Sequence, residues 1–417
     1  MKVLVIGSGA REHALAWKFS KSKRIAGLFI APGIAGTEAV GTNCPDLDPL
    51  DFRVVHELCV DRGINLVLVG PEQPLAEGIV DYLGERDIPT VGPPRRAAML
   101  EASKSFSKRF MEKHGIPTAA AQEFSRFREF REAIGGIAGR VVIKKSGLAG
   151  GKGVLETSDP EEALSFGKRI LSDDSLLLEE FLEGFELSVF ALTDGRSYVL
   201  LPPCADFKKA GEDDTGLNTG GMGSVCPVPT VDQTLLGRIE HEVVVPTIRG
   251  LEAEGLFYRG VLYFGLMITE NGPRVLEYNV RFGDPETQVL MPLIDSDFGN
   301  LMEAIMSGTL SEFPVRINTR SAVGVVVASQ GYPKSYKKGL VAEVPSDLPE
   351  NRGLIFHAAT SKDRQGRVRT GGGRCFTVVG LAHDTYSATR QAYEAVGSVR
   401  FDGSWYRRDI ARRFYTD

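Results

Sequence analysis

The sequence has little of what a nucleic-acid binder or a membrane protein needs. Its 417 residues carry 49 lysines and arginines against 54 aspartates and glutamates, a net charge of −5, whereas general binding to nucleic acid requires a basic excess. No apolar run approaches the roughly 18 residues that cross a membrane. The apolar run at the N-terminus is broken by Arg11 and Glu12 before it is long enough for a signal peptide. We therefore expect a cytoplasmic protein without nucleic-acid or membrane partners.

Cysteine is also scarce. The five cysteines are scattered, and no two of them form a C-x-x-C pair. A disulfide framework or a zinc site would need closer or paired spacing. We expect these thiols to be reduced and to serve as small core residues.

The chain is long enough for two to four domains. Its first hundred residues alternate short apolar runs with helical patterns, which predicts an open parallel α/β layer. A helical stretch at 96–114 leads into a second α/β segment that runs to about 313. Beyond Arg316 two β-rich runs flank a glycine-rich turn, which predicts a small α+β domain. In the first layer we expect strands at 3–6, 27–30 and 66–69, and helices at 11–20 and near 77–84.

The N-terminal strand ends in Gly7-x-Gly9, like a dinucleotide fingerprint. Glu12 stands where the third glycine belongs, and the next strand ends in Ala-Pro-Gly without an acid for a ribose hydroxyl. Nicotinamide binding is therefore disfavoured. A tight strand-to-helix turn and a helix N-terminus that holds one phosphate of a smaller ligand both remain open. Glu72 follows a later strand at the same sheet edge, where it either binds sugar hydroxyls or is a solvated loop acid.

Residues 141–154 (VVIKKSGLAGGKGV) join a β-branched run to a glycine-rich loop. The run at 141–143 predicts a buried strand that ends at Lys144, and Lys152 lies within the loop. Glycine lets backbone N–H groups approach a ligand, and lysine is a point charge suited to phosphate. The loop is not a P-loop, because three residues rather than four separate its glycines and a glycine follows the lysine. Another phosphate-binding loop and a flexible surface turn remain open.

Two further segments combine apolar and acidic residues. In a strand, Glu277, Asn279 and Arg281 would share one face, and carboxylate and carboxamide oxygens suit Mg²⁺ held jointly with phosphates. A solvent-facing strand is the alternative. The segment LLLEEFLEG at 176–184 could present backbone groups to an adenine, with Glu186 placed for ribose hydroxyls. In isolation it cannot be told from a core strand with exposed acids.

In this order along the chain, these features resemble the ATP-grasp ligases, and within them the phosphoribosylamine–glycine ligase (glycinamide ribonucleotide synthetase) family of purine biosynthesis. The resemblance spans essentially the whole sequence, from MKVLVIG to WYRRDI. Its most specific motifs are NTGGMG (218–223), RFGDPETQ (281–288) and GLAGGKGV (147–154). It implies an N-terminal substrate-binding domain at 1–102 and an ATP-grasp domain at 103–313 with a mobile flap at about 118–188. A C-terminal α+β domain at 314–417 follows.

The resemblance implies a role for each matching residue. ATP, the co-substrate, is expected to be bound by Lys104, Lys144, Gly150, Gly151, Lys152, Glu179, Glu180, Phe181, Leu182 and Glu186. Glu277 and Asn279 are expected to hold Mg²⁺ or Mn²⁺, and Arg281, Asp284 and Lys152 to act in catalysis. The other substrates are expected to contact Gly7, Gly9, Glu72, Asn218, Thr219, Gly220, Gly221 and Arg374. A second acid that many ATP-grasp proteins carry is missing from 262–268.

The implied reaction joins glycine to 5-phosphoribosylamine through a glycyl phosphate, in a monomer or weak homo-oligomer that binds small molecules only. The sequence departs from the family pattern at Lys145, Ser146, Gly150, Phe207, Lys209 and Leu217. These departures leave two alternatives open. One is an ATP-grasp carboxylate–amine ligase for other substrates, and the other is a catalytically silent nucleotide-binding paralogue.

Overall fold

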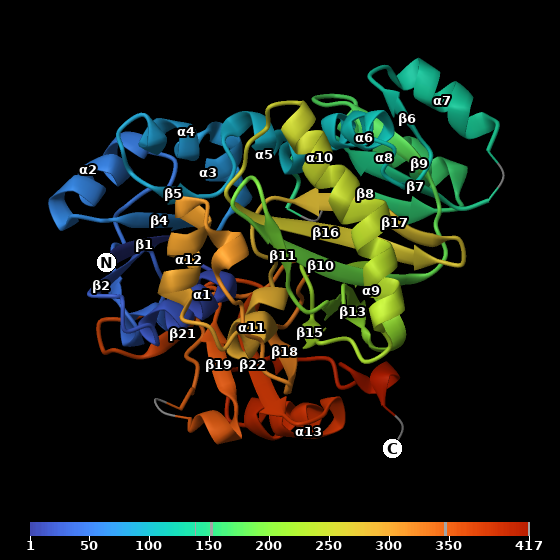
Figure 1. Ribbon diagram of the computed structural model, residues 1–417. Helices are drawn as coiled ribbons and strands as arrows, with labels where there is room; N and C mark the ends of the chain where they lie inside the picture. Colours follow the sequence, from blue (N-terminus) through green and yellow to red (C-terminus); the bar gives the residue numbers. More distant parts are fainter. Residues whose placement is uncertain (138, 151–152, 346–347, 416–417) are drawn as a thin grey trace.

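The computed structural model describes residues 1–137, 139–150, 153–345 and 348–415 (Figure 1). The predicted fold class, a parallel α/β domain followed by an ATP-grasp-like centre and an α+β end, is confirmed. The N-terminal sheet is parallel, in the order β3-β2-β1-β4-β5. Its strands are β1 (Lys2–Gly7), β2 (Gly27–Pro32), β3 (Thr42–Asn43), β4 (Leu66–Val69) and β5 (Thr90–Val91). Val3 to Ile6 are fully buried, as expected for a central strand covered on both faces.

Two predicted helices of this region are interrupted. The helix expected near 77–84 is preceded by another, because Gly78 (φ +96°) separates them. The helical stretch expected at 96–114 is broken at Ser103, whose side chain accepts a hydrogen bond from the N–H of Phe106 and caps a new helix. The helices are α1 (Ala10–Ser20), α2 (Phe52–Arg62), α3 (Glu72–Glu77), α4 (Ile79–Gly84), α5 (Arg95–Ala102) and α6 (Lys104–Lys113).

The central sheet is antiparallel, in the order β11-β10-β16-β17. Its apolar face packs against α9 and α10 through a cluster that includes Val243, Leu251, Phe264 and Tyr278. A π-helical turn (Glu240–Val244) joins these two helices. The elements are β10 (Phe185–Thr193), β11 (Tyr198–Leu200), β16 (Gly260–Thr269), β17 (Gly272–Asn279), α9 (Gln233–Ile239) and α10 (Val245–Ala253).

A second small sheet, here called the flap, lies at the upper right of Figure 1. Its strands follow the order β6-β9-β7-β8 and are covered by α7 and α8. Its buried residues, among them Phe130, Ile143 and Leu176, form a hydrophobic cluster separate from those of the other sheets. The elements are β6 (Ala121–Phe124), α7 (Phe127–Gly135), β7 (Val141–Lys145), β8 (Val154–Thr157), α8 (Pro160–Ile170) and β9 (Leu176–Glu180).

The C-terminal sheet takes two of its strands from the middle of the chain. Its order is β12-β15-β18-β22-β19, with β23 paired to β18, and α13 packs on β18 and β22. Because β12 and β15 join this sheet, the loop between them is held beside the C-terminal domain. The elements are β12 (Ala205–Asp206), β15 (Gly223–Cys226), α11 (Glu286–Leu290), α12 (Phe298–Ser307), β18 (Ser321–Ser329), β19 (Leu354–His357), β22 (Arg374–Ala382), α13 (Thr385–Val396) and β23 (Ser404–Trp405). Two hairpins add β13 (Lys209–Gly211) with β14 (Thr215–Asn218), and β20 (Thr360–Lys362) with β21 (Val368–Thr370).

Candidate active site

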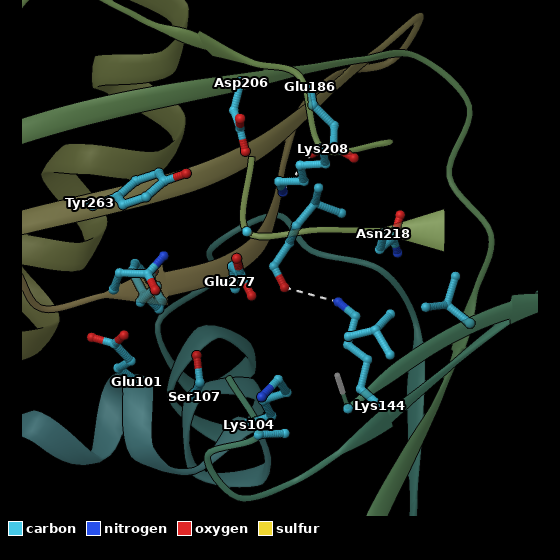
Figure 2. A pocket seen from close by; sticks show the side chains of 18 of the residues that line it. Glu101, Lys104, Ser107, Lys144, Glu186, Asp206, Lys208, Asn218, Tyr263 and Glu277 are labelled. Atoms are coloured by element: carbon cyan, nitrogen blue, oxygen red, sulfur yellow. Dashed lines mark hydrogen bonds and ion pairs between the residues drawn. The ribbon is translucent and has the colours of Figure 1, made fainter. Parts of the chain in front are cut away.

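A cavity of about 450 Å³ lies between the flap, the central sheet and the loop from β12 to β15 (Figure 2). Most of the predicted site residues meet at its wall although they come from distant parts of the sequence. They are Glu72, Lys104, Lys144, Gly150, Glu179, Glu180, Phe181, Leu182, Glu186, Asn218, Thr219, Gly220, Glu277, Asn279, Arg281, Asp284 and Arg374. Gly7, Gly9 and Gly221 are not part of this wall. Gly151 and Lys152 lie outside the described residues.

The turn of Gly7 and Gly9 already contains an anion of the chain itself. The Glu12 carboxylate accepts a hydrogen bond from the N–H of Gly9 at 2.6 Å and another from Nε of Arg11 at 2.5 Å. A Cβ atom at Gly7, Gly9 or Gly70 would lie within 2.7 Å of the Glu12 side chain. A phosphate at this helix N-terminus would therefore meet a carboxylate, which is a physical argument against the ligand contact expected at Gly7 and Gly9.

Lys104 is placed where the flap meets the core. It begins α6, and its backbone N–H donates to the carbonyl of Ser146 on the flap at 2.9 Å. A bridge between Ser103 and Gly147 adds to this junction. Burial lowers the pKa of the Lys104 ammonium group, and the carboxylate of Glu277 partly offsets this effect.

Lys144 projects from β7 into the cavity (Figure 2), and its ammonium group pairs with Glu179. Its Nζ lies 2.7 Å from Oε2 of Glu179 and donates to the carbonyl of Leu276 at 3.0 Å. The other carboxylate oxygen of Glu179 lies 2.9 Å from Nζ of Lys108. Burial would raise the pKa of Glu179, but the ammonium groups of Lys144 and Lys108 outweigh it and hold the pKa below its usual value. Glu179 and the carbonyl of Leu276 therefore orient the ammonium group of Lys144 without a ligand.

The segment after β9 reaches the rim of the cavity. The side chain of Glu180 accepts a hydrogen bond from the N–H of Ala120 at 2.8 Å. The ring of Phe181 lies under the guanidinium of Arg140, 4.5 Å from the ring centre. Glu180, Phe181 and Leu182 all line the cavity, so the segment expected to bind ATP lies at its rim.

Glu186 lies across the cavity and pairs with a lysine that the sequence analysis did not select. Nζ of Lys208 is 2.6 Å from Oε2 of Glu186, and Figure 2 shows both side chains above Glu277. Burial would lower the pKa of Lys208, but the carboxylates of Glu186, Glu277 and Asp206 outweigh it and raise the pKa. A third cation therefore joins Lys104 and Lys144 around Glu277.

Glu277 and Asn279 lie two residues apart in β17, as predicted, and both contribute to the cavity wall. A bulge sets their direction, because Val275 opposes Leu266 while Glu277 opposes Gly265. Burial would raise the pKa of Glu277, but Lys208, Lys104 and Lys144 hold it below its usual value.

These two side chains fit a divalent cation. Neither side chain has a hydrogen-bond partner among the described residues. The carboxylate of Glu277 and the amide oxygen of Asn279 are hard oxygen ligands, which Mg²⁺ and Mn²⁺ prefer. The described residues contain no group of three or more His, Cys, Asp or Glu side chains arranged for a metal. A cation at Glu277 and Asn279 would therefore complete its coordination with oxygens from the substrates.

Arg281 lies beyond the end of β17 and is held by two carboxylates. Its Nη2 is 2.7 Å from Oε1 of Glu101, and its Nε is 3.7 Å from Oε2 of Glu72. The other oxygen of Glu101 accepts from the N–H of Val280 at 2.8 Å. Burial would lower the pKa of Arg281, but Glu101 and Glu72 raise it, so the guanidinium remains charged at the cavity wall.

Arg374 ties the predicted glycine-rich loop to Asp284. Its Nη2 lies 3.3 Å from Oδ2 of Asp284. Its Nη1 donates to the carbonyls of Asp284 at 3.0 Å and Gly221 at 3.3 Å, and also to that of Gly220. Asp284 also accepts from Nε2 of Gln288 at 2.8 Å. Arg374 is thus largely engaged by the protein and fixes the loop that carries Thr219.

Two further acids line the cavity, the buried Glu286 and the half-buried Asp206. Oε1 of Glu286 accepts from the hydroxyls of Tyr263 at 2.7 Å and Ser188 at 3.0 Å. Oδ1 of Asp206 has no hydrogen-bond partner among the described residues. Burial raises the pKa of Asp206 well above its usual value, and Glu286 adds to the effect.

Three residues of the flap depart from the family pattern, namely Lys145, Ser146 and Gly150. The side chains of Lys145 and Ser146 point away from the cavity. Nζ of Lys145 lies 2.9 Å from Asp173, and the hydroxyl of buried Ser146 donates to that of Ser105 at 2.9 Å. Gly150 is on the cavity wall, with φ +53°. The cation gained at Lys145 is therefore not available to phosphates in this structure.

The other departures lie in the loop between β12 and β15. Phe207 is 2% exposed and belongs to the C-terminal hydrophobic cluster. Lys209 lies 3.7 Å from Glu156 of the flap, and Leu217 is half exposed. None of the three lines the cavity.

Among the charged cavity residues that the sequence analysis missed, Glu101 and Lys108 are buried, whereas Asp206 and Lys208 are half-buried. Lys108 follows Lys104 by one helical turn, so the i,i+4 spacing could have placed both on one face. Lys208 and Asp206 are in a loop rich in polar residues, where nothing local distinguishes a buried side chain from a solvated one. Glu101 had no signal, because its partner Arg281 is 180 positions away.

Comparisons with known proteins follow the same division of the chain. Models of phosphoribosylglycinamide synthetase match residues 1–101 (N domain), 102–287 (ATP-grasp domain) and 322–413 (C domain). The phosphoribosylamine–glycine ligase of Chlorobaculum tepidum is 43% identical, over 99% of this chain and all of that protein. The trifunctional purine biosynthetic protein adenosine-3 of Gallus gallus is also 43% identical, but the chain spans only 42% of its length.

The structural comparison agrees. A crystal structure of phosphoribosylamine–glycine ligase from Thermotoga maritima has a TM-score of 0.85 at 37% identity and covers 99% of this chain and all of that one. The biotin carboxylase domain of a 2-oxoglutarate carboxylase from Hydrogenobacter thermophilus shares the fold, with a TM-score of 0.72 at 16% identity over 97% of this chain and 91% of that one. Within the described residues no helix is long and apolar enough to cross a membrane. The chain belongs to the phosphoribosylglycinamide synthetase family, whose central domain is an ATP-grasp domain.

Proposed function

We propose that this protein ligates glycine to 5-phosphoribosylamine and consumes ATP, giving glycinamide ribonucleotide, ADP and phosphate in purine biosynthesis. One observation supports this proposal above the others. Lysines from the two sides of one cavity, Lys104 on the core and Lys144 on the flap, face Glu277 and Asn279 across it. This is the charge arrangement that a triphosphate with a divalent cation requires.

The reaction has two steps. An oxygen of the glycine carboxylate attacks the γ-phosphorus, the bond to the β-phosphate oxygen breaks, and ADP leaves. The amine nitrogen of phosphoribosylamine then attacks the carbonyl carbon of glycyl phosphate. Phosphate leaves with the bonding electrons, and the amine loses a proton as the amide forms. Positioning and charge compensation supply most of the rate in such transfers.

The chain's own residues divide this work. Lys104, Lys144 and Lys208 compensate the charge of the transferring phosphoryl group, and Arg281 orients the glycine carboxylate. Asn218, Thr219 and Asp284 orient the amine, with Glu72 at the ribose. When bound at Glu277 and Asn279, Mg²⁺ or Mn²⁺ screens the phosphate oxygens from the approaching carboxylate. We infer that the protein works in the cytoplasm, as a monomer or a weak homo-oligomer.

The test uses purified protein with ATP, Mg²⁺, glycine and freshly generated phosphoribosylamine. The expected result is equal amounts of ADP and of a product with the mass of glycinamide ribonucleotide. ATP binding without turnover would support the silent paralogue. Turnover only with another amino acid, such as alanine or serine, would support an altered ligase. Either outcome overturns the proposed function.

A further inference from the structure

Arg407 is a fully buried cation that lies outside the cavity. Its side chain is 1% exposed and is the largest among the fully buried ones described. Its Nε and Nη2 donate to the two carboxylate oxygens of Asp409 at 2.8 and 2.6 Å. Its Nη1 donates to the carbonyl of Lys209 and to Oδ1 of Asp214, each at 2.9 Å. Burying a charge is costly unless it is paired in this way. The buried guanidinium therefore depends on these partners and fixes their positions.

Two of these partners are in the loop that brings Lys208 to the cavity. Arg407 holds the carbonyl of Lys209, the next residue along the chain. The carbonyl of Lys208 itself accepts from the N–H of Thr219 at 2.7 Å. The guanidinium also lies over the ring of Phe207, 5.3 Å from its centre. The main chain around Lys208 is therefore fixed on both sides.

The loop conformation depends on the C-terminal segment. Asp213 and Asp214 have φ values of +54° and +52°, which cost energy for residues with a Cβ atom. The N–H of Asp213 donates to Asp409 at 2.9 Å. Arg407 and Arg413 pair with the two oxygens of Asp214 at 2.9 and 3.0 Å. Bonds from outside the loop thus stabilise a backbone that is unfavourable by itself.

The C-terminal segment is in turn anchored to its own domain. The hydroxyl of Tyr393 on α13 donates to the carbonyl of Arg407 at 2.8 Å and accepts from the N–H of Ile410 at 3.0 Å. A continuous set of hydrogen bonds therefore runs from α13 through Arg407 to the loop. It ends at the carbonyl of Lys209, the residue next to Lys208, whose ammonium group lies beside Glu186 and Glu277 in the cavity.

We propose that Arg407 is a positioning residue for Lys208, and that residues 405–410 act as a brace that holds this lysine in place for catalysis. This inference rests on the proposed function, since the catalysis in question is the ligation of glycine to phosphoribosylamine. A displacement of about 1 Å in a charge-compensating group can cost about 100-fold in rate. Through the brace, residues 405–410 affect the rate although none of them lines the cavity.

The first experiment compares Arg407→Met with Arg413→Met. Arg413 is a matched control, because it pairs with the same Asp214 and lies over the same Phe207 ring, but is 40% exposed. We expect kcat to fall at least tenfold in Arg407→Met while the KM for ATP changes less than threefold. Arg413→Met should keep kcat within threefold of wild type. Arg407→Lys, which retains the charge beside Asp409, should recover part of the loss. Equal effects of the two methionine variants would overturn the proposal.

The decisive experiment repeats Arg407→Met in a Lys208→Met background. If Arg407 acts through Lys208, the second substitution adds less than a twofold decrease to the loss from Lys208→Met alone. A further decrease of the full tenfold would show a general structural role and overturn the proposal. Asp214→Asn, at a half-exposed side chain, gives the same comparison if Arg407→Met does not fold.

A readout independent of catalysis separates this inference from the proposed function. Trypsin cleavage after Lys208 and Lys209 should be at least fivefold faster in Arg407→Met than in wild type or Arg413→Met. Cleavage at the other sites that all three proteins share should be unchanged. Equal rates in the three proteins would overturn the brace, whether or not the wild type makes glycinamide ribonucleotide. Absence of that product in the wild type would overturn only the proposed function.

Discussion

The ammonium group of Lys144 lies 2.7 Å from the carboxylate of Glu179, and both side chains are less than 10% exposed. Glu179 also pairs with Lys108 of α6, so one carboxylate joins a flap lysine to a core lysine. Phosphate groups that enter the cavity would compete for the same cation. The pair therefore links the stability of the protein to nucleotide binding.

Lys144→Met should weaken ATP binding by about 10- to 100-fold, because a charge-assisted contact in a buried site contributes about 1.5–3 kcal/mol. Lys145→Met is the matched control, since that neighbouring lysine pairs with Asp173 at the surface. Isothermal titration with ATP and Mg²⁺ measures both variants. Equal losses would mean that Lys144 does not contact the triphosphate.

Glu179→Gln should lower the melting temperature without nucleotide, because two buried ammonium groups lose their shared partner, at a cost of about 3–5 kcal/mol. ATP should restore more stability to this variant than to wild type, since its phosphates replace the lost charge. Thermal melts with and without ATP measure the difference. Glu180→Gln, at the exposed neighbouring position, should behave like wild type, and an equal ATP effect in all three proteins would contradict the prediction.

Glu277→Gln and Asn279→Ala should each lower kcat at least 100-fold at limiting Mg²⁺, because the first removes the negative charge of the expected metal ligand and the second removes the amide oxygen. The fold should persist, since neither side chain has a protein hydrogen-bond partner among the described residues. Steady-state rates over a Mg²⁺ titration, with circular dichroism for the fold, test both variants. Near-normal activity in either would rule out its role as a metal ligand.

The interface between α1 and β19 should weaken as the pH falls from about 6.5. Nδ1 of His13 accepts from the N–H of His357, and His13 packs against Phe356. Burial, with His357 adding, lowers the pKa of His13 to about 3, and burial, with Lys362 adding, lowers that of His357 to about 4. The folded state thus binds fewer protons than the unfolded state. Stability should fall with decreasing pH by up to about 1.4 kcal/mol per pH unit for each histidine.

Urea unfolding between pH 7.5 and 5 measures this slope above the range in which most carboxylates titrate. His13→Gln, which keeps an acceptor, should reduce the slope by about one proton. His241→Gln, at an exposed position, is the control and should leave it unchanged. A slope that is the same in all three proteins would show that His13 binds its proton in the folded state as readily as in the unfolded state, which would contradict the prediction.

The parts of the site that could be predicted depend on short-range patterns. The alternation of a strand placed Glu277 and Asn279 on one face, and the end of a β-branched run placed Lys144 at the cavity. The position of Ser103 as a helix cap was present in the sequence, but a continuous helical pattern concealed it. The contacts of these residues could not be predicted in the same way. Glu101 and Lys208 gain their roles from partners far along the chain, and no local pattern records such distances.

The C-terminal sheet shows the same limit at the level of topology. Its strands β12 and β15 are two and four residues long, too short for an alternation to distinguish them from loop. β12 pairs with β15, and β15 pairs with β18, which lies about a hundred residues further along the chain. The predicted third domain was therefore right in class, while the contribution of 205–226 to its sheet was not anticipated. The brace by Arg407 is a consequence of that contribution.

The glycine turn of the N-terminal sheet resembles the turn that binds the pyrophosphate of a dinucleotide. The carboxylate of Glu12 occupies this turn and disfavours such anions. Dinucleotides and free nucleotides are abundant anions in any cell, and an empty glycine turn at that sheet edge would attract their pyrophosphates. With Glu12 in the turn, a pyrophosphate would meet a carboxylate there instead of free N–H groups.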